Sequence, residues 1–182
     1  MTMPDLKEPS FEHRVPDGDN RLRQVCTDCG FIAYENPKVV VGAVVTWGPK
    51  ILLCRRAINP RKGFWTLPAG FMELHESAEV GAAREAMEEA NARIEIDALL
   101  AAYTIPRLSQ VQLIYRARLV DPHISAGIES LEVGLFDYAD IPWEDLAFPS
   151  VRWALTQYAE IKDRLSFSAF SNPPGESGDH GT

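Results

Sequence analysis

The chain is short of cysteine, and it lacks long apolar segments. Its 182 residues include only three cysteines, and an odd, small number of cysteines does not suggest a framework of disulfides. No apolar run approaches the length that would span a membrane, and the first residues have neither the basic nor the apolar region of a signal peptide. We therefore expect a cytoplasmic protein that has no membrane partner.

The chain is also short of positive charge. Its 26 Asp and Glu outnumber its 18 Lys and Arg, which gives a net charge of −8. Binding to long nucleic acids is dominated by neutralisation of phosphates. No basic patch interleaved with aromatic side chains is visible, so a long nucleic acid is not an expected partner. A small anionic substrate stays open, because a bound metal ion can supply local positive charge.

The pattern of apolar residues predicts a single α/β domain with appended segments. Five segments rich in β-branched and apolar residues favour strands, and they cover residues 38–47, 50–56, 93–105, 111–120 and 131–141. An apolar stripe with helical spacing follows over residues 149–165. The main domain is thus expected over 37–165, after an N-terminal segment, 1–36, and before a polar tail, 166–182, that we expect to be disordered.

Most of the functional information lies in residues 70–92, where the chain reads GFMELHESAEVGAAREAMEEANA. Ser77 is a good N-cap for a helix there. Glu85, Glu88 and Glu89 would fall at positions i, i+3 and i+4 of that helix, on one side of it, although like charges at this spacing repel one another. Oxygen ligands at such a density suit Mg²⁺ or Mn²⁺. We therefore predict a divalent metal site.

The opposite side of the same helix carries Val80, Ala83 and Met87. Amphipathic helices pack through their apolar side. We therefore expect the helix to pack through these three residues and to point its carboxylates outward.

The acidic stretch also has a specific spacing, G-x5-E-x7-R-E-x2-E-E. Its fixed residues are Gly70, Glu76, Arg84, Glu85, Glu88 and Glu89. The pattern resembles the Nudix box, the signature of hydrolases that cleave nucleoside diphosphates linked to another group. Asn91 stands where that family usually has glycine, and asparagine is the next most tolerated residue in the left-handed conformation that closes a helix. The full spacing disfavours the alternative, a solvated acidic face.

The resemblance covers about residues 13–160, in segments such as CTDCG, YENPK, FWTLPAGFME and IPWEDLAF. It is strongest to a subgroup that carries an N-terminal zinc ribbon and includes bacterial proteins similar to plant FAD and ADP-ribose pyrophosphatases. It implies the Nudix fold, a mixed β-sheet sandwiched between α-helices, preceded here by a short remnant of the ribbon.

The ribbon is incomplete in this sequence. A structural zinc site needs four Cys or His ligands, and only one pair, Cys26 and Cys29, is present. By spacing, the other pair would fall near Pro4 and Lys7, and His13 alone does not complete the set. We therefore expect no zinc at this remnant.

The resemblance implies metal-dependent hydrolysis of a diphosphate bridge, with Mg²⁺ or Mn²⁺ as cofactor. The catalytic residues that it implies are Glu76, Arg84, Glu85, Glu88 and Glu89. The metal ligands that it implies are the carboxylates of Glu85, Glu88, Glu89 and Glu129 and the backbone carbonyl of Gly70. Glu76 is expected to pair with Arg84, whose rigid fork suits the orientation of a carboxylate. Glu129 is favoured over Glu132 as the acid from outside the box, and the general base is left open.

The expected substrate is an ADP-containing compound, FAD or ADP-ribose, from which AMP would be released. The candidates for substrate binding are Pro106, Gln110 and Phe64, and Trp47 and Tyr103 are further aromatic candidates for stacking on a base. Pro106 lies roughly where ADP-ribose hydrolases have a proline. NADH is an alternative, although Val111 after Gln110 leaves the NADH-cleaving signature incomplete.

Two other functions stay open. Some Nudix domains have lost catalysis and sense nucleotides, but the complete acidic box argues against this alternative. Cleavage of capped RNA is disfavoured by the net charge of −8. The resemblance also allows a homodimer, since members of the family are often dimers.

Overall fold

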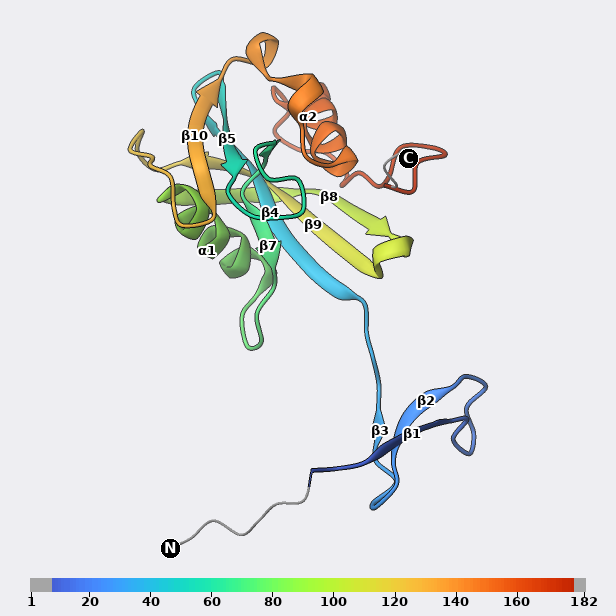
Figure 1. Cartoon of the computed structure of the whole chain (residues 1–182). Helices are drawn as coiled ribbons and strands as arrows, with labels where there is room; N and C mark the ends of the chain where they lie inside the picture. Colours follow the sequence, from blue (N-terminus) through green and yellow to red (C-terminus); the bar gives the residue numbers. More distant parts are fainter. Residues whose placement is uncertain (1–7, 179–182) are drawn as a thin grey trace, which may run out of the picture. The chain divides into compact units, whose positions relative to one another are not determined.

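The computed structural model describes residues 8–178. The chain divides into two compact units, residues 1–36 and 37–182. In the first unit, three short antiparallel strands form a sheet in the order β1-β2-β3 (Figure 1). These strands are β1 (Phe11–Arg14), β2 (Arg23–Cys26) and β3 (Ile32–Ala33).

The second unit is built on a mixed sheet of seven strands. The main path is β10-β5-β4-β9-β8, with β6 paired to β5 and β7 paired to β4. One pair of neighbours on this path, β4 and β9, runs parallel, and the other three pairs run antiparallel. The strands are β4 (Lys38–Trp47), β5 (Lys50–Arg56), β6 (Trp65–Thr66), β7 (Ala69–Phe71), β8 (Ile94–Ile105), β9 (Gln110–Leu119) and β10 (Ser130–Phe136).

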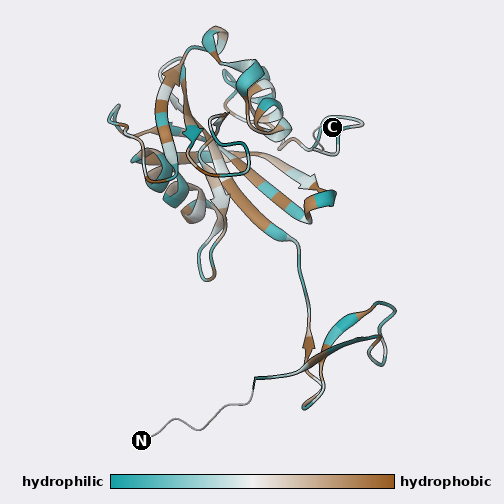
Figure 2. Ribbon diagram, viewed as in Figure 1, coloured by the Kyte–Doolittle hydropathy of each residue, from teal (hydrophilic) through white to brown (hydrophobic). Residues whose placement is uncertain are grey.

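Helix α1 (Ala78–Ala90) covers one face of the sheet and helix α2 (Pro149–Ile161) covers the other (Figure 1). Three 3-10 turns lie in the connections, and they are η1 (Pro106–Leu108), η2 (Tyr138–Asp140) and η3 (Trp143–Asp145). The sheet is apolar on both faces, with one buried cluster under each helix, and Figure 2 shows the apolar colour concentrated in the central strands. The predicted fold is therefore confirmed. No helix among residues 8–178 is long and apolar enough to cross a membrane.

Both ends of α1 follow from local sequence. The Ser77 hydroxyl accepts a hydrogen bond from the Val80 N–H at 3.3 Å, which satisfies one of the free donors of the first turn. Asn91 closes the helix in the left-handed conformation, with φ 47°. Both observations agree with the sequence prediction, because capping depends on residues close together in the chain.

The orientation predicted for α1 is wrong. The helix packs through small residues, which are Gly81, Ala82, Ala86 and Ala90. Val80 and Met87 are instead 58% and 40% exposed. Glu85 and Glu89 consequently face the interior, where they are 8% and 5% exposed. Two of the three clustered carboxylates are therefore buried, and of the three only Glu88 points outward as expected.

Close packing of α1 on the sheet explains this difference. A Cβ atom added to Gly81 would lie 2.8 Å from Val41 Cγ2 of β4 and 2.6 Å from Glu76 Oε1. No larger side chain fits between helix and strand at this point, because real Cβ atoms do not approach so closely. The apolar but larger side chains of Val80 and Met87 are thus left on the outside.

The prediction of a disordered tail is wrong for residues 166–178. The Phe170 N–H donates to Leu100 O at 2.9 Å, and the Ala102 N–H donates to Phe170 O at 3.0 Å. The Asn172 side chain accepts from the Thr104 N–H at 2.9 Å and donates to Thr104 O at 2.8 Å. These bonds satisfy backbone groups on the free edge of β8, a role that composition cannot reveal. Residues 179–182 of the predicted tail lie outside the described range.

Candidate active site

A cavity of about 1060 Å³ opens where α1, β7 and the start of α2 approach one another. One part of its lining is acidic and contains most of the residues predicted from the Nudix-like spacing, namely Gly70, Arg84, Glu85, Glu88, Glu89 and Glu129. Another part is apolar and contains Ile105, Leu108, Ile114, Phe148 and Val151. The fold thus joins a charged group of side chains to a surface suited to an apolar ring.

Arg84 holds the acidic group together. Its Nη2 and Nε donate to the two oxygens of Glu76 at 2.9 and 3.1 Å, and its Nη1 donates to Glu85 at 2.7 Å and to Glu88 at 3.0 Å. The hydrogen bonds from Arg84 lower the pKa of Glu76 to about 2. The predicted pair of Glu76 and Arg84 is therefore confirmed. With its two oxygens engaged, Glu76 orients Arg84, and Arg84 orients the other carboxylates.

Glu85 and Glu89 are held in an environment that opposes their charge. Burial, with the neighbouring Glu85 charge, raises the pKa of Glu89 to about 8. Burial also raises the pKa of Glu85. The Ala69 N–H donates to Glu89 Oε2 at 3.4 Å. Burial opposes the ionised form of both carboxylates, and the Arg84 guanidinium beside Glu85 offsets part of this effect on the pKa of Glu85.

The donor set suits a hard divalent cation. Carboxylate oxygens are the ligands that Mg²⁺ and Mn²⁺ prefer, and Arg84 Nη1 already lies between Glu85 and Glu88 as a positive charge. In the present conformation of residues 8–178, no three His, Cys, Asp or Glu side chains are grouped closely enough to hold a metal ion. Binding would therefore require a side chain to turn, and Glu88, which is 57% exposed, has room to do so.

Burial of Glu89 makes a testable prediction about stability. Because its pKa is about 8 in the folded protein and near 4.3 in an unfolded chain, the folded state binds this proton more strongly between those values. The contribution of Glu89 to the free energy of unfolding of the metal-free protein should therefore fall as pH rises from about 5 toward 8, by on the order of 4 kcal/mol.

Chemical denaturation in EDTA between pH 5 and about 8 would measure this effect. In the Glu89→Gln variant, which has no such proton to lose, this decrease should be absent. Added Mg²⁺ should restore stability at high pH if it binds the folded state. If the free energy of unfolding falls with pH as steeply in the variant as in the original protein, the assignment to Glu89 is contradicted.

Gly70 brings the backbone of β7 against Glu85. It pairs with Val41 of β4 in the sheet, and a Cβ atom added to Gly70 would lie 2.4 Å from Glu85 Oε2. The glycine is required for this close approach rather than for an unusual backbone conformation. The backbone of Gly70, whose carbonyl the sequence predicted as a metal ligand, therefore lies next to a carboxylate from the same predicted set.

We expect Gly70→Ala to displace Glu85, to lower kcat at least about tenfold, and to lower the free energy of unfolding by about 1–3 kcal/mol. Enzyme assays and chemical denaturation would measure the two effects. A double-mutant cycle with Glu85→Ala provides the control, since the added methyl group should cost much less stability once the Glu85 carboxylate is gone. If the losses of stability in the two single variants simply add in the double variant, the methyl group added at Gly70 does not act through the Glu85 carboxylate.

Glu129 is placed by a segment that docks on the end of α1. The Gly127 N–H donates to Glu89 O at 3.0 Å, and the Ser125 N–H donates to Ala90 O at 2.9 Å. A Cβ atom on Gly127 would lie only 1.7 Å from the backbone oxygen of Glu88, so only glycine permits this contact. Glu129 lines the cavity, whereas Glu132 does not and pairs instead with Arg55 at 3.5 Å.

The residues predicted to bind substrate are only partly in place. Gln110 lines the cavity, whereas Phe64 and Pro106 are not part of its lining, although Arg107 and Leu108 of η1 are. Trp47 lies at the hairpin end of β4, outside the lining. Tyr103 cannot stack on a base, because it is fully buried and donates to Gln157 at 2.5 Å.

Sequence reasoning missed Arg56 and Phe148, which both line the cavity. The Arg56 guanidinium lies 5.2 Å from the centre of the Phe148 ring, and its Nε donates to Pro60 O at 2.9 Å. Its charge acts on Glu89 and favours the ionised carboxylate. Nothing local distinguishes these residues, since β5 and the start of α2 meet only in the folded chain.

The N-terminal unit brings together the one predicted cysteine pair. Cys26 is buried at the end of β2 and Cys29 is exposed. Over residues 8–178 no group of three or more possible metal ligands is formed, and His13 pairs in the sheet with Gln24. Pro4 and Lys7 lie outside the described residues. That this remnant binds no zinc stays a prediction.

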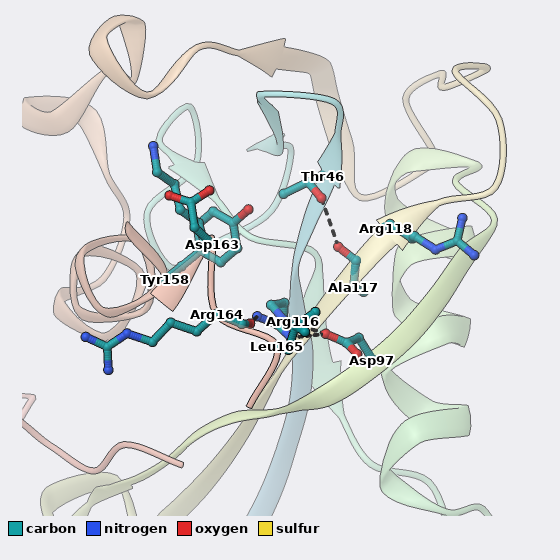
Figure 3. A pocket seen from close by; sticks show the side chains of 10 residues that line it. Thr46, Asp97, Arg116, Ala117, Arg118, Tyr158, Asp163, Arg164 and Leu165 are labelled. Carbon is teal, nitrogen blue, oxygen red and sulfur yellow. Dashed lines mark hydrogen bonds and ion pairs between the residues drawn. The ribbon is translucent and has the colours of Figure 1, made fainter. Parts of the chain in front are cut away.

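A second cavity, of about 380 Å³, is lined by residues of β4, β9 and the end of α2. Figure 3 shows Arg116 of β9 directed toward Asp97 and Arg164. Arg116 pairs with Asp97, donates to Arg164 O at 2.8 Å, and lies 4.7 Å from the centre of the Phe167 ring. Its donors therefore fasten the end of α2 to the sheet, which is a structural role.

Comparison with known proteins agrees with this geometry. The NUDIX domain family matches residues 36–154, and a family described as Nudix N-terminal matches residues 8–35. A crystal structure of a NUDIX hydrolase from Nitrosomonas europaea is 45% identical, with a TM-score of 0.85 over 94% of this chain and 99% of that one.

Two relatives have more specific names. The ADP-ribose pyrophosphatase of Methanocaldococcus jannaschii is 31% identical over 113 residues, which are 60% of this chain and 67% of that protein. The NAD-capped RNA hydrolase NudC of Haemophilus influenzae is 33% identical over 87 residues, 46% of this chain and 32% of that protein.

The fold, the acidic cavity and these matches together define the class: the chain belongs to the Nudix family of hydrolases. It is a Nudix pyrophosphatase, which hydrolyses a nucleoside diphosphate linked to another group. Enzymes of this family act with divalent metal ions on small nucleotide substrates.

Proposed function

We propose that this enzyme hydrolyses the diphosphate bridge of an ADP-containing compound, ADP-ribose or FAD, and releases AMP. The observation that carries the proposal is the pair of buried carboxylates, Glu85 and Glu89, whose pKa values are raised where they line a cavity with an apolar side. Buried charge of this kind is costly unless a cation and an anionic ligand share the site.

The proposed cofactor is Mg²⁺ or Mn²⁺. Its ligands would be the carboxylates of Glu85, Glu88, Glu89 and Glu129 and the carbonyl of Gly70. When bound, the ion supplies positive charge to the diphosphate and makes the attacking water more acidic.

The other steps belong to residues of the chain. Arg84 holds Glu85 and Glu88 in place, and Glu76 fixes Arg84 from the other side. The Ala69 N–H holds one oxygen of Glu89. A carboxylate that lines the cavity takes the proton of the attacking water, and the bridging oxygen leaves with AMP or with the second phosphate.

The substrate class follows from the lining of the cavity. Arg56 adds positive charge close to Glu89, where a phosphate would lie. Phe148 and its apolar neighbours offer a surface for a base. The relative named ADP-ribose pyrophosphatase favours ADP-ribose, and the similarity of the sequence to FAD-cleaving pyrophosphatases favours FAD. NADH is the second candidate, because it shares a dinucleotide with NAD-capped RNA, on which the relative NudC is named as acting.

A hydrolysis panel tests this proposal. Purified protein is incubated with FAD, ADP-ribose, NADH, diadenosine polyphosphates or capped RNA, with Mg²⁺ or with EDTA, and the products are identified. We expect Mg²⁺-dependent release of AMP, together with ribose 5-phosphate from ADP-ribose or FMN from FAD. Turnover of none of these compounds, with tight binding of ADP-ribose, would support a nucleotide-sensing protein instead.

We further propose that the enzyme works in the cytoplasm and forms a homodimer. Both proposals come from the sequence analysis. Light scattering coupled to size-exclusion chromatography would measure the mass in solution, and a mass near 20.3 kDa, that of one chain, would reject the dimer.

A further inference from the structure

The C-terminal segment, residues 166–178, ends at the active-site cavity. Figure 1 shows this segment in red as it leaves α2 on the side of β8. Its last described residue, Gly178, is buried and is part of the cavity lining. A Cβ atom on Gly178 would lie 2.4 Å from Ile105 Cδ1 and 3.4 Å from Trp153. The segment therefore closes tightly against Ile105, itself a lining residue.

Two anchors fix the path of this segment along β8. Phe170 exchanges backbone hydrogen bonds with Leu100 and Ala102. Two residues later, the Asn172 side chain bonds to both backbone groups of Thr104, at 2.9 and 2.8 Å, and so imitates a paired strand. Its amide nitrogen also donates to Glu176 O at 3.1 Å, which bends residues 173–178 into a closed turn.

A third anchor comes from the interior. The Gln157 side chain of α2 is 8% exposed and donates to Ser171 O at 3.0 Å. The oxygen of the same amide accepts from the Tyr103 hydroxyl at 2.5 Å. Gln157 thus connects the core with the segment, and a buried amide with both ends satisfied holds its partners firmly.

The part of the cavity that this segment reaches is apolar. Gly178 lies against Ile105, and the lining also contains the apolar residues Ile114, Phe148 and Val151, whereas the carboxylates lie on α1 and just before β10. A flat apolar ring gains free energy from such a surface, and a sugar phosphate does not. The base of the substrate is therefore the group that belongs there.

We propose that residues 173–178 form the end wall of the base-binding part of the cavity and so determine how tightly the enzyme holds the base. This inference rests on the proposed function, since it assumes a substrate with a base at one end. The wall acts on binding, because it contains none of the charged groups that act on the diphosphate.

Two truncations test the wall. The first ends the chain after Asn172, which removes residues 173–182 but keeps the bonds of Asn172 to Thr104 and of Gln157 to Ser171. The matched control ends after Gly178 and removes only residues 179–182. Calorimetry with Mg²⁺ measures the binding of AMP, which carries the base, and of inorganic pyrophosphate, which does not. Steady-state assays with ADP-ribose separate KM from kcat.

The wall predicts at least about a tenfold loss of AMP affinity in the first truncation and an unchanged affinity for pyrophosphate. KM for ADP-ribose should rise by a similar factor, with kcat within about twofold. The control truncation should match the full chain. If the first truncation does not fold, Asn172→Ala releases the same turn at full chain length. This variant should likewise lose AMP affinity and keep its affinity for pyrophosphate.

Equal AMP affinity in the full chain and in the folded variants would contradict the proposal that residues 173–178 form the end wall. A loss of pyrophosphate affinity as large as the loss of AMP affinity would also contradict it. The two proposals fail in distinguishable ways. If the full chain hydrolyses no compound of the panel but AMP affinity still falls on truncation, the wall stands and the proposed function does not.

Discussion

Replacing Glu89 with glutamine is expected to lower kcat for Mg²⁺-dependent hydrolysis by a factor on the order of 10³, which corresponds to about 4 kcal/mol of transition-state stabilisation. Glu89 is 5% exposed and faces the cavity beside Glu85. Glutamine has nearly the same shape but no charge, so it cannot hold a divalent cation in the same way. Steady-state assays over a range of Mg²⁺ concentrations would measure the loss.

The stability of this variant separates loss of catalysis from loss of fold. Because burial disfavours the charge of Glu89, the metal-free Glu89→Gln protein should be at least as stable as the original at pH 8. Glu88→Gln should also lose activity. Glu160→Gln, on the exposed side of α2, is the matched control and should keep full turnover. Wild-type kcat in both box variants would reject the proposed metal site.

Replacing Arg84 with lysine is expected to lower kcat about 10- to 100-fold, the usual cost of losing a group that orients metal ligands. Arg84 makes two bonds to Glu76, one each to Glu85 and Glu88, and one to the backbone oxygen of Phe71. A lysine keeps the charge but cannot reproduce this planar fork. The loss should be larger in kcat than in KM for the substrate.

Glu76→Gln provides the partner measurement for Arg84. If Glu76 acts only by fixing Arg84, the kcat of the Glu76→Gln, Arg84→Lys double variant should be no lower than that of Arg84→Lys alone. Such a result is strong coupling in a double-mutant cycle. Arg93→Lys, at an exposed ion pair with Asp121, should leave activity unchanged. Independent, additive losses of kcat in the Glu76 and Arg84 variants would contradict the hypothesis that Glu76 acts through Arg84.

Much of the site follows from local sequence. The spacing of Glu85, Glu88 and Glu89 places them on one wedge of any helix, and Ser77 and Asn91 mark where that helix begins and ends. The pair of Glu76 and Arg84 could be predicted for the same reason, because both residues belong to one short stretch of chain. Strands β4 and β5 were also predictable, from their continuous apolar runs.

Other features depend on residues far apart in the sequence. Phe148 and Arg56 meet across 92 positions in the chain numbering, so no local pattern predicts their contact. Glu129 and Glu132 differ little as sequence candidates. Glu129 reaches the cavity because the segment around Gly127 docks on the end of α1.

The sequence by itself determined which chemistry this chain can perform, because helix geometry and capping are local and fix how the acidic side chains are spaced. Only the tertiary structure decided which of them are buried. Helix α1 turns its small residues, and not Val80 and Met87, toward β4, because close packing against the sheet outweighs hydrophobicity there. The same long-range packing orders residues 166–178 along β8, where their polar side chains satisfy an open strand edge.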